Sequence, residues 1–86
     1  MKYIIYCKKK DDTIESWFGG FNEYGRIMWS RGRRPVWAGK GGYWLEPYKF
    51  NSLRVARKAL NKVIMDDMVH GVLGTWNNVV KETDEP

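Results

Sequence analysis

The fold class depends on residues 50–64, which read Phe-Asn-Ser-Leu-Arg-Val-Ala-Arg-Lys-Ala-Leu-Asn-Lys-Val-Ile and predict an amphipathic helix. Asn51 is a favourable N-cap residue, and Phe50 and Val55 have the spacing of a hydrophobic staple at a helix start. Apolar residues then recur every three or four positions and predict one buried face. They are Leu53, Ala56, Leu60, Val63 and Ile64.

After this stretch, Gly71 is the expected end of the helix, following His70 at its C-terminus. Residues 65–69 fit either a last helical turn or irregular structure. Residues 75–81 contain strand-forming tryptophan and valine and predict a final strand. The polar residues 83–86 predict a frayed tail.

Three further segments, before the helix, have strand character. They are residues 2–8, 13–18 and 26–30. The first is apolar on both faces, which is typical of a central strand. The turn at 9–12 is too short for a parallel crossover, so the second strand returns antiparallel. The glycines at 19–20 predict a bend or bulge, and residues 22–25 predict a hairpin turn into the third strand.

Residues 31–42 show no periodicity and contain four glycines and a proline, so we expect a basic, glycine-rich loop. Residues 43–50 are a candidate short edge strand, because Pro47 is unfavourable in a central one. The order β-β-β-(β)-α-β predicts one α+β domain over residues 1–86. Its antiparallel sheet would have three to five strands, with one main helix packed on one face.

The composition predicts a folded cytoplasmic protein. A hydrophobic fraction of 43% and thirteen aromatic residues argue against disorder. No apolar run approaches the roughly 20 residues that cross a membrane. The N-terminal segment is too short for a signal peptide, since lysines at 8–10 end it. The single cysteine, Cys7, forms no internal disulfide and is expected to pack as an apolar residue.

Positive charge gathers in the middle of the chain. Ten basic residues and one acid, Glu46, lie between Arg26 and Lys62, whereas the protein as a whole carries a charge of +5. Six aromatic residues occupy the same stretch. A segment that is both cationic and aromatic indicates binding to an anionic partner or to flat groups.

Catalytic and metal-binding patterns are weak. A nucleophile–base pair would need His70 with Cys7 or a serine, and nothing near Cys7 in sequence lowers its pKa. The acid pairs at 11–12 and 66–67 lack the spacing of a calcium loop. Residues 39–42 lack the other residues of a phosphate-binding loop. The sequence therefore predicts a protein that is not an enzyme and that uses no cofactor or metal.

The candidate partner-binding residues come from the loop and from the polar helix face. They are Arg31, Arg33, Arg34, Trp37, Lys40, Trp44, Arg54, Arg57, Lys58 and Lys62. Three arginines within four positions suit phosphate or carboxylate recognition. A basic helix face alone is common in soluble proteins. Trp37 and Trp44 either contact the partner or cover the sheet edge, whereas Trp17, Trp29 and Trp76 are expected in the core.

Two segments carry a resemblance: Gly-Arg-Ile-Met-Trp at residues 25–29, and Phe-Asn-Ser-Leu-Arg-Val-Ala-Arg-Lys-Ala-Leu at residues 50–60. Over residues 24–64 the chain resembles, in architecture, short proteins encoded by bacteriophages and mobile elements. Several of these, including anti-CRISPR proteins and host-polymerase inhibitors, are single-domain binders that block a host complex. The group shares no residue motif, so the resemblance assigns no site residue.

Two functional hypotheses follow. The favoured one is a non-enzymatic inhibitor or modulator that docks on a host protein or a nucleic-acid-handling complex, because the acidic C-terminal third limits the total positive charge. The alternative is a protein that binds DNA or RNA directly through phosphate and stacking contacts.

Overall fold

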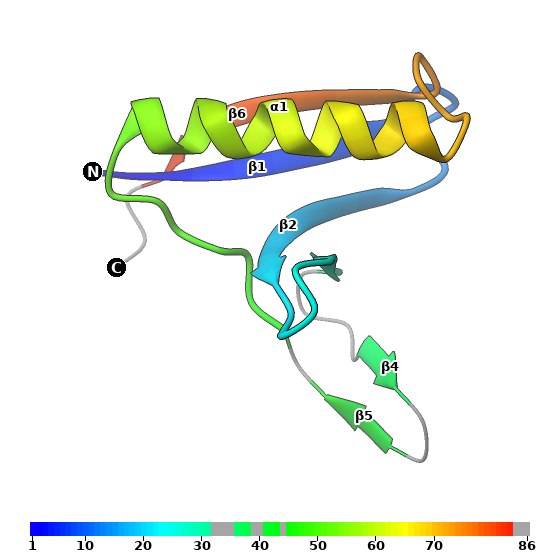
Figure 1. The fold of residues 1–86 in the computed structure, drawn as a ribbon, viewed down its shortest axis with the longest axis horizontal. Helices are drawn as coiled ribbons and strands as arrows, with labels where there is room; N and C mark the ends of the chain where they lie inside the picture. The colour runs from blue at the N-terminus through cyan, green and yellow to red at the C-terminus, as the bar shows by residue number, and fades with distance from the viewer. Residues whose placement is uncertain (32–35, 39–40, 44, 84–86) are drawn as a thin grey trace.

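The computed structural model describes residues 1–31, 36–38, 41–43 and 45–83, and its arrangement of strands and helix is shown in Figure 1. The elements are, in chain order, β1 (Lys2–Lys9), β2 (Glu15–Phe21), β3 (Ile27–Ser30), β4 (Val36–Ala38), β5 (Gly41–Tyr43), α1 (Leu53–Val69) and β6 (Trp76–Thr83). This order confirms the predicted α+β class.

Four strands form an antiparallel sheet in the order β3-β2-β1-β6. The central position predicted for the first strand is confirmed, since β1 pairs with β2 on one side and with β6 along its whole length on the other. The helix α1 lies along β1 and β6 on one face of this sheet, while β2 curves away from it (Figure 1).

The glycine pair in β2 forms the predicted irregularity. The pairing of β2 with β3 shifts register between Phe18 and Phe21, and Gly20 has a φ of 103°. A side chain at Gly20 would be strained in that conformation and would also press on the ring of Tyr48. The hairpin turn after it is confirmed as well, because Asn22 N donates to the carbonyl of Arg26.

The helix begins one residue later than the N-cap prediction. Ser52 is the N-cap, with extended backbone angles, and its hydroxyl accepts from the backbone N–H of Val55 at 3.5 Å. The side chain of Asn51 instead accepts a hydrogen bond from the ammonium of Lys2. The helix continues to Val69, so residues 65–69 are helical, and Gly71 follows the C-cap His70 with a φ of 70° as predicted.

The buried face of the helix is rotated from the predicted stripe. Ala56, Ala59, Val63 and Asp67 are its buried residues, whereas Leu53, Leu60 and Ile64 are half-buried. Small side chains allow the helix to approach the sheet closely, so the alanines take the centre. No helix in the described part of the chain is long and apolar enough to span a membrane.

The core lies between α1 and the sheet. It consists of Ile5, Cys7, Phe18, Phe50, Ala56, Ala59 and Val63, with Trp29 and Trp76 packed partly buried against it. The prediction of Trp17 as a core residue is wrong. Neighbouring strand residues point to opposite faces, and Phe18 occupies the core face, so Trp17 lies on the far face beside Tyr6.

Two predictions for the segment before the helix are also wrong. The loop expected at 31–42 contains the strands β4 and β5, which pair with each other; three-residue strands are too short to show periodicity. The edge strand expected at 43–50 does not form: Tyr43 is the last residue of β5, and residues 45–50 contain no strand. This segment bonds to the sheet at single points, such as Tyr48 N to the carbonyl of Phe18. Thr83 belongs to β6, and the rest of the predicted tail lies outside the described residues.

Ile5 and Ile14 allow a matched test of this core. Ile5 is fully buried, whereas Ile14 is 36% exposed and precedes β2. We expect Ile5→Ala to lower the free energy of unfolding by about 2–5 kcal/mol, because it leaves a cavity. Ile14→Ala should cost less than about 1 kcal/mol. Urea unfolding of both variants measures the difference, and equal losses would contradict the placement of Ile5.

Candidate binding groove along the helix

A groove along α1 arises because one helix covers only part of the sheet. A helix is about 10 Å wide with its side chains, and adjacent strands lie about 4.8 Å apart, so one helix covers about two of the four strands. In this fold the covered strands are β1 and β6. The hollows that lie between the side of α1 and the strands beyond β1 share lining residues with one another, and together we call them the groove.

The first section of the groove lies beside the N-terminal half of α1 and is apolar. It has a volume of about 500 Å³ and is lined by Phe18, Gly20, Phe21, Tyr48, Phe50, Val55, Lys58, Ala59 and Lys62. Phe21, Tyr48 and Val55 are 42%, 49% and 52% exposed. Large apolar side chains exposed next to one another are typical of a contact surface.

Cations border this apolar section. Lys62 Nζ lies 5.1 Å from the centre of the Phe21 ring, in a cation–π contact. Arg54, Arg57 and Lys58 are exposed and form no ion pair within the described part of the chain. Of these cations, Lys58 lines the section together with Lys62, and the two form a positive rim beside the aromatic floor.

The middle section is shallow and links the two ends. It shares Phe21 and Lys62 with the first section, has Arg26 on its strand side, and continues to Met65 and Val69 on the helix. Met65 and Val69 are largely exposed, and Met68 is exposed on the same half of the helix. The positive rim thus gives way to apolar side chains toward the C-terminus of α1.

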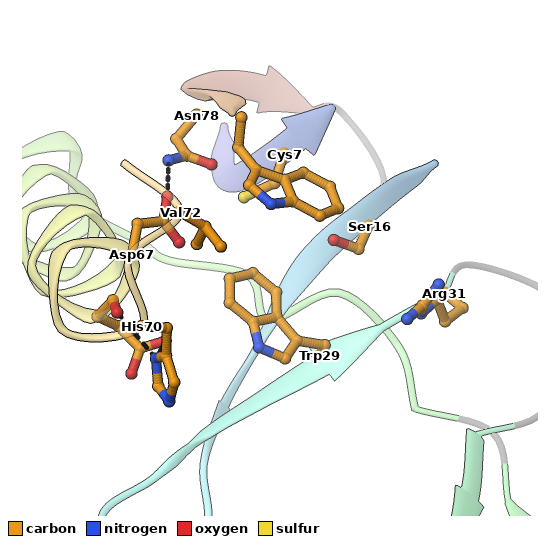
Figure 2. A pocket seen from close by; sticks show the side chains of 10 residues that line it. Cys7, Ser16, Trp29, Arg31, Asp67, His70, Val72 and Asn78 are labelled. Carbon is orange, nitrogen blue, oxygen red and sulfur yellow. Dashed lines mark hydrogen bonds and ion pairs between the residues drawn. The ribbon is translucent and has the colours of Figure 1, made fainter. Parts of the chain in front are cut away.

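The groove ends in a pocket of about 310 Å³ between the C-terminus of α1 and the strands. Figure 2 shows its labelled residues: Cys7 and Ser16 from β1 and β2, Trp29 from β3, and Asp67 from the helix. Trp76 at the start of β6 also lines it. Two tryptophans and a buried carboxylate therefore share one cavity.

The acids of the pocket have different partners. One carboxylate oxygen of Asp67, Oδ2, accepts a hydrogen bond from Asn78 Nδ2 at 2.8 Å (Figure 2). Asp66 is more exposed, and its Oδ2 lies 3.4 Å from His70 Nδ1, which also contacts the carbonyl of Asp66 at 2.9 Å. Asp66 is thus engaged by the C-cap histidine, while Asp67 points inward.

Cys7 and His70, the pair that a catalytic site would require, both line this pocket. They lie on opposite sides of it (Figure 2), and His70 is held by Asp66 instead. Burial, with a smaller contribution from the charge of Asp67, raises the pKa of the Cys7 thiol to about 12. A thiol held neutral in this way is a poor nucleophile.

The predicted site residues divide into three groups. Arg54, Arg57, Lys58 and Lys62 lie exposed on α1, as predicted, and the last two border the groove. Arg31 is exposed after β3 and lines the pocket. Arg33, Arg34, Lys40 and Trp44 lie outside the described residues, as does the side chain of Trp37, so their partner-binding role stays a prediction.

Sequence reasoning missed the aromatic floor and the pocket. One signal was available, because Asp67 follows Val63 by four positions and so continues the buried stripe with an acid. The tryptophans of the pocket, Trp29 and Trp76, were assigned to the core, although both are half-buried. Their access to a cavity follows from the uncovered strands, which no local pattern reveals.

The opposite face of the sheet carries a second aromatic group. Tyr6 and Trp17 lie with ring centres 5.4 Å apart, and Lys81 Nζ lies 4.2 Å from the centre of the Tyr6 ring. The Tyr6 hydroxyl donates to Glu15 at 2.5 Å, and this interaction raises the Tyr6 pKa. These side chains contact one another across β1, β2 and β6.

Comparisons with known proteins add no name to this site. No protein-family model matches the chain, and no curated protein or solved structure matches it. Among the described residues, no group of three or more histidine, cysteine, aspartate or glutamate side chains is placed to hold a metal ion.

The raised pKa of Cys7 predicts a pH dependence of stability. The unfolded thiol titrates near its usual value of 9.0, whereas the folded one titrates near 12. Between these values the folded state binds more protons, so the free energy of unfolding falls as pH rises, by up to about 1.4 kcal/mol per pH unit. Below pH 9 the contribution is complete.

Cys7→Ala isolates this effect from other groups that titrate at high pH. Its free energy of unfolding, measured with urea at several pH values, should decline less steeply between pH 9 and 12 than that of the parent. Equal slopes would show that the folded thiol titrates normally. A thiol reagent should label the parent fully only after denaturation.

Proposed function

We propose that this protein is a small non-enzymatic binding protein that docks through the groove onto a partner protein. The observation that carries the proposal is a pair of cations, without an ion pair among the described residues, beside an exposed aromatic floor. Lys58 and Lys62 border the groove that Phe21, Tyr48 and Val55 line. A partner segment with acidic and apolar side chains matches both features.

The charge pattern along the groove favours a protein over a nucleic acid. A phosphate backbone that followed the groove from Lys58 would reach the carboxylates of Asp66 and Asp67 at its other end. Like charges placed together cost binding energy. Met65, which is exposed in the section between these ends, suits an apolar partner surface, because methionine adapts to irregular contacts.

The resemblance to phage and mobile-element proteins supplies the class of partner. In this proposal the chain inhibits or modulates a host protein or a nucleic-acid-handling complex by occupying one of its surfaces. Such a role needs no catalytic residues, in keeping with the neutral, buried Cys7. Direct binding to DNA or RNA is the competing function, and the experiment below separates the two.

Lys58→Glu tests the docking surface without loss of the helix. The substitution places a carboxylate four residues from both Arg54 and Lys62, where each i,i+4 pair stabilises a helix by roughly 0.2–0.5 kcal/mol. We expect at least about a tenfold loss of affinity for the partner, because a favourable contact becomes repulsive. The measurement is capture of partner proteins from bacterial lysate after nuclease treatment, followed by titration of the captured protein.

Lys10→Glu is the matched control. It changes the net charge by the same amount at an exposed turn position that does not line the first section of the groove, and should bind as the parent does. Full binding by Lys58→Glu would contradict docking through this surface. Capture that nuclease abolishes, together with oligonucleotide affinity falling steeply between roughly 50 and 200 mM salt, would instead establish direct nucleic-acid binding.

A further inference from the structure

We propose that the pocket at the C-terminal end of the groove binds a guanidinium group, presented by an arginine side chain of the partner. The group would insert between Trp29 and Trp76 and donate hydrogen bonds to Asp67. This inference rests on the proposed function in one respect: the arginine is taken to belong to the docked partner protein. The capacity of the pocket for a guanidinium group stands by itself.

The buried carboxylate is the first argument. Asp67 is 7% exposed, and a carboxylate so deeply buried is normally paired with a cation, because removing its charge from water is costly. Within the described part of the chain, its sole side-chain hydrogen bond comes from the neutral amide of Asn78 to Oδ2. The other oxygen, Oδ1, has no such partner there, and Figure 2 shows the side chain facing the pocket.

The aromatic walls are the second argument. Trp29 lies on β3 and Trp76 on β6, the two outer strands of the four-stranded sheet, and both line the cavity. Tryptophan is the strongest cation–π partner among the side chains. A guanidinium group is flat and weakly hydrated, so it stacks on indole rings and still donates two parallel hydrogen bonds to a carboxylate.

The local potential is the third argument. The pocket lies at the C-terminus of α1, where the helix dipole favours cations, and no basic residue occupies the last turn. His70 is engaged by Asp66. Of the cations that line the pocket, this leaves Arg31, which lies across it from Asp67 beyond Trp29 (Figure 2). Arg26 lies with Asp66 and His70 in an adjoining hollow that Asp67 does not line. The Asp67 carboxylate is therefore left for a cation from outside.

The two ends of the groove then define a pattern in the partner. Lys58 and Asp67 are separated by roughly 14 Å along the helix axis. An extended chain covers that distance in about four residues. The matching segment carries an acidic residue for the lysine end and, about four residues away, an arginine for the pocket, with apolar side chains between them.

The test uses small probes and the indole N–H signals of the full protein in NMR. Nα-acetyl-arginine amide at about 10 mM, a suitable concentration for fragment affinities, should shift the signals of Trp29 and Trp76 but not that of Trp17. Nα-acetyl-lysine amide should bind more weakly. Asp67→Asn, which keeps the shape of the side chain, should weaken arginine binding by about tenfold or more.

Two further variants act as controls. Glu15→Gln removes the same charge from the opposite face of the sheet and should leave binding unchanged. Arg31→Ala removes a competing cation, so arginine should bind as well as before or more tightly. Loss of arginine binding in Arg31→Ala would mean that the probe depends on Arg31 and not on Asp67 alone, and would overturn the inference.

Other results would overturn it as well: no shift with arginine, equal affinity for lysine, full binding by Asp67→Asn, or tighter binding of guanosine than of arginine. If Asp67→Asn fails to fold, the comparison of arginine with lysine and the Arg31→Ala variant decide the question. Failure of these probes, with partner capture still sensitive to Lys58→Glu, would remove the pocket inference and leave the docking surface in place.

Discussion

One helix packed against a four-stranded sheet is the constraint on which the other features of this fold depend. Because α1 can cover about two strands, it packs on β1 and β6, and other side chains must cover the inner faces of β2 and β3. The segment before the helix places Tyr48 and Phe50 against Phe18, with ring centres 6.1 and 5.7 Å away. These aromatic rings cover part of the sheet that α1 does not reach. The part that they leave uncovered lines the groove.

The two halves of the helix have opposite electrostatic character. Its outer face is basic near the N-terminus, which is the end that the helix dipole makes unfavourable for cations, and the first turn holds no acid. Its last turn holds acids and no basic residue, again against the dipole. Neither arrangement stabilises the isolated helix. Charges that oppose local stability at both ends are consistent with a surface arranged for a partner.

The sequence predicted the elements of this fold better than their contacts. The helix, the antiparallel strands, the bulge at the glycine pair and Gly71 as the helix end follow from local chemistry, and all four are confirmed. Two details were predicted one residue off. The N-cap is Ser52 and not its neighbour Asn51, and Phe18, not its neighbour Trp17, faces the core. In both places adjacent residues of similar character fit either position.

The candidate site was harder to predict, because it is assembled from distant segments. The basic helix face follows from periodicity, but the groove requires knowledge of which strands α1 leaves open. The pocket joins residues as far apart as Cys7 and Asn78. An acid on an apolar stripe, such as Asp67, is the one local sign of it. The candidate residues 33, 34, 40 and 44 fall outside the described residues, so the loop part of the prediction stays a prediction.

The pairing of β1 with β6 has a consequence for how the chain reaches this state in the cell. Lys2 is registered with Thr83, so the central strand lacks one neighbour until β6 is available. Closing so long a loop is entropically costly, and non-local pairing slows folding. A nascent chain on the ribosome therefore keeps Ile5 and the apolar face of the helix without their final cover. Until β6 pairs, β1 is the exposed edge of an incomplete sheet.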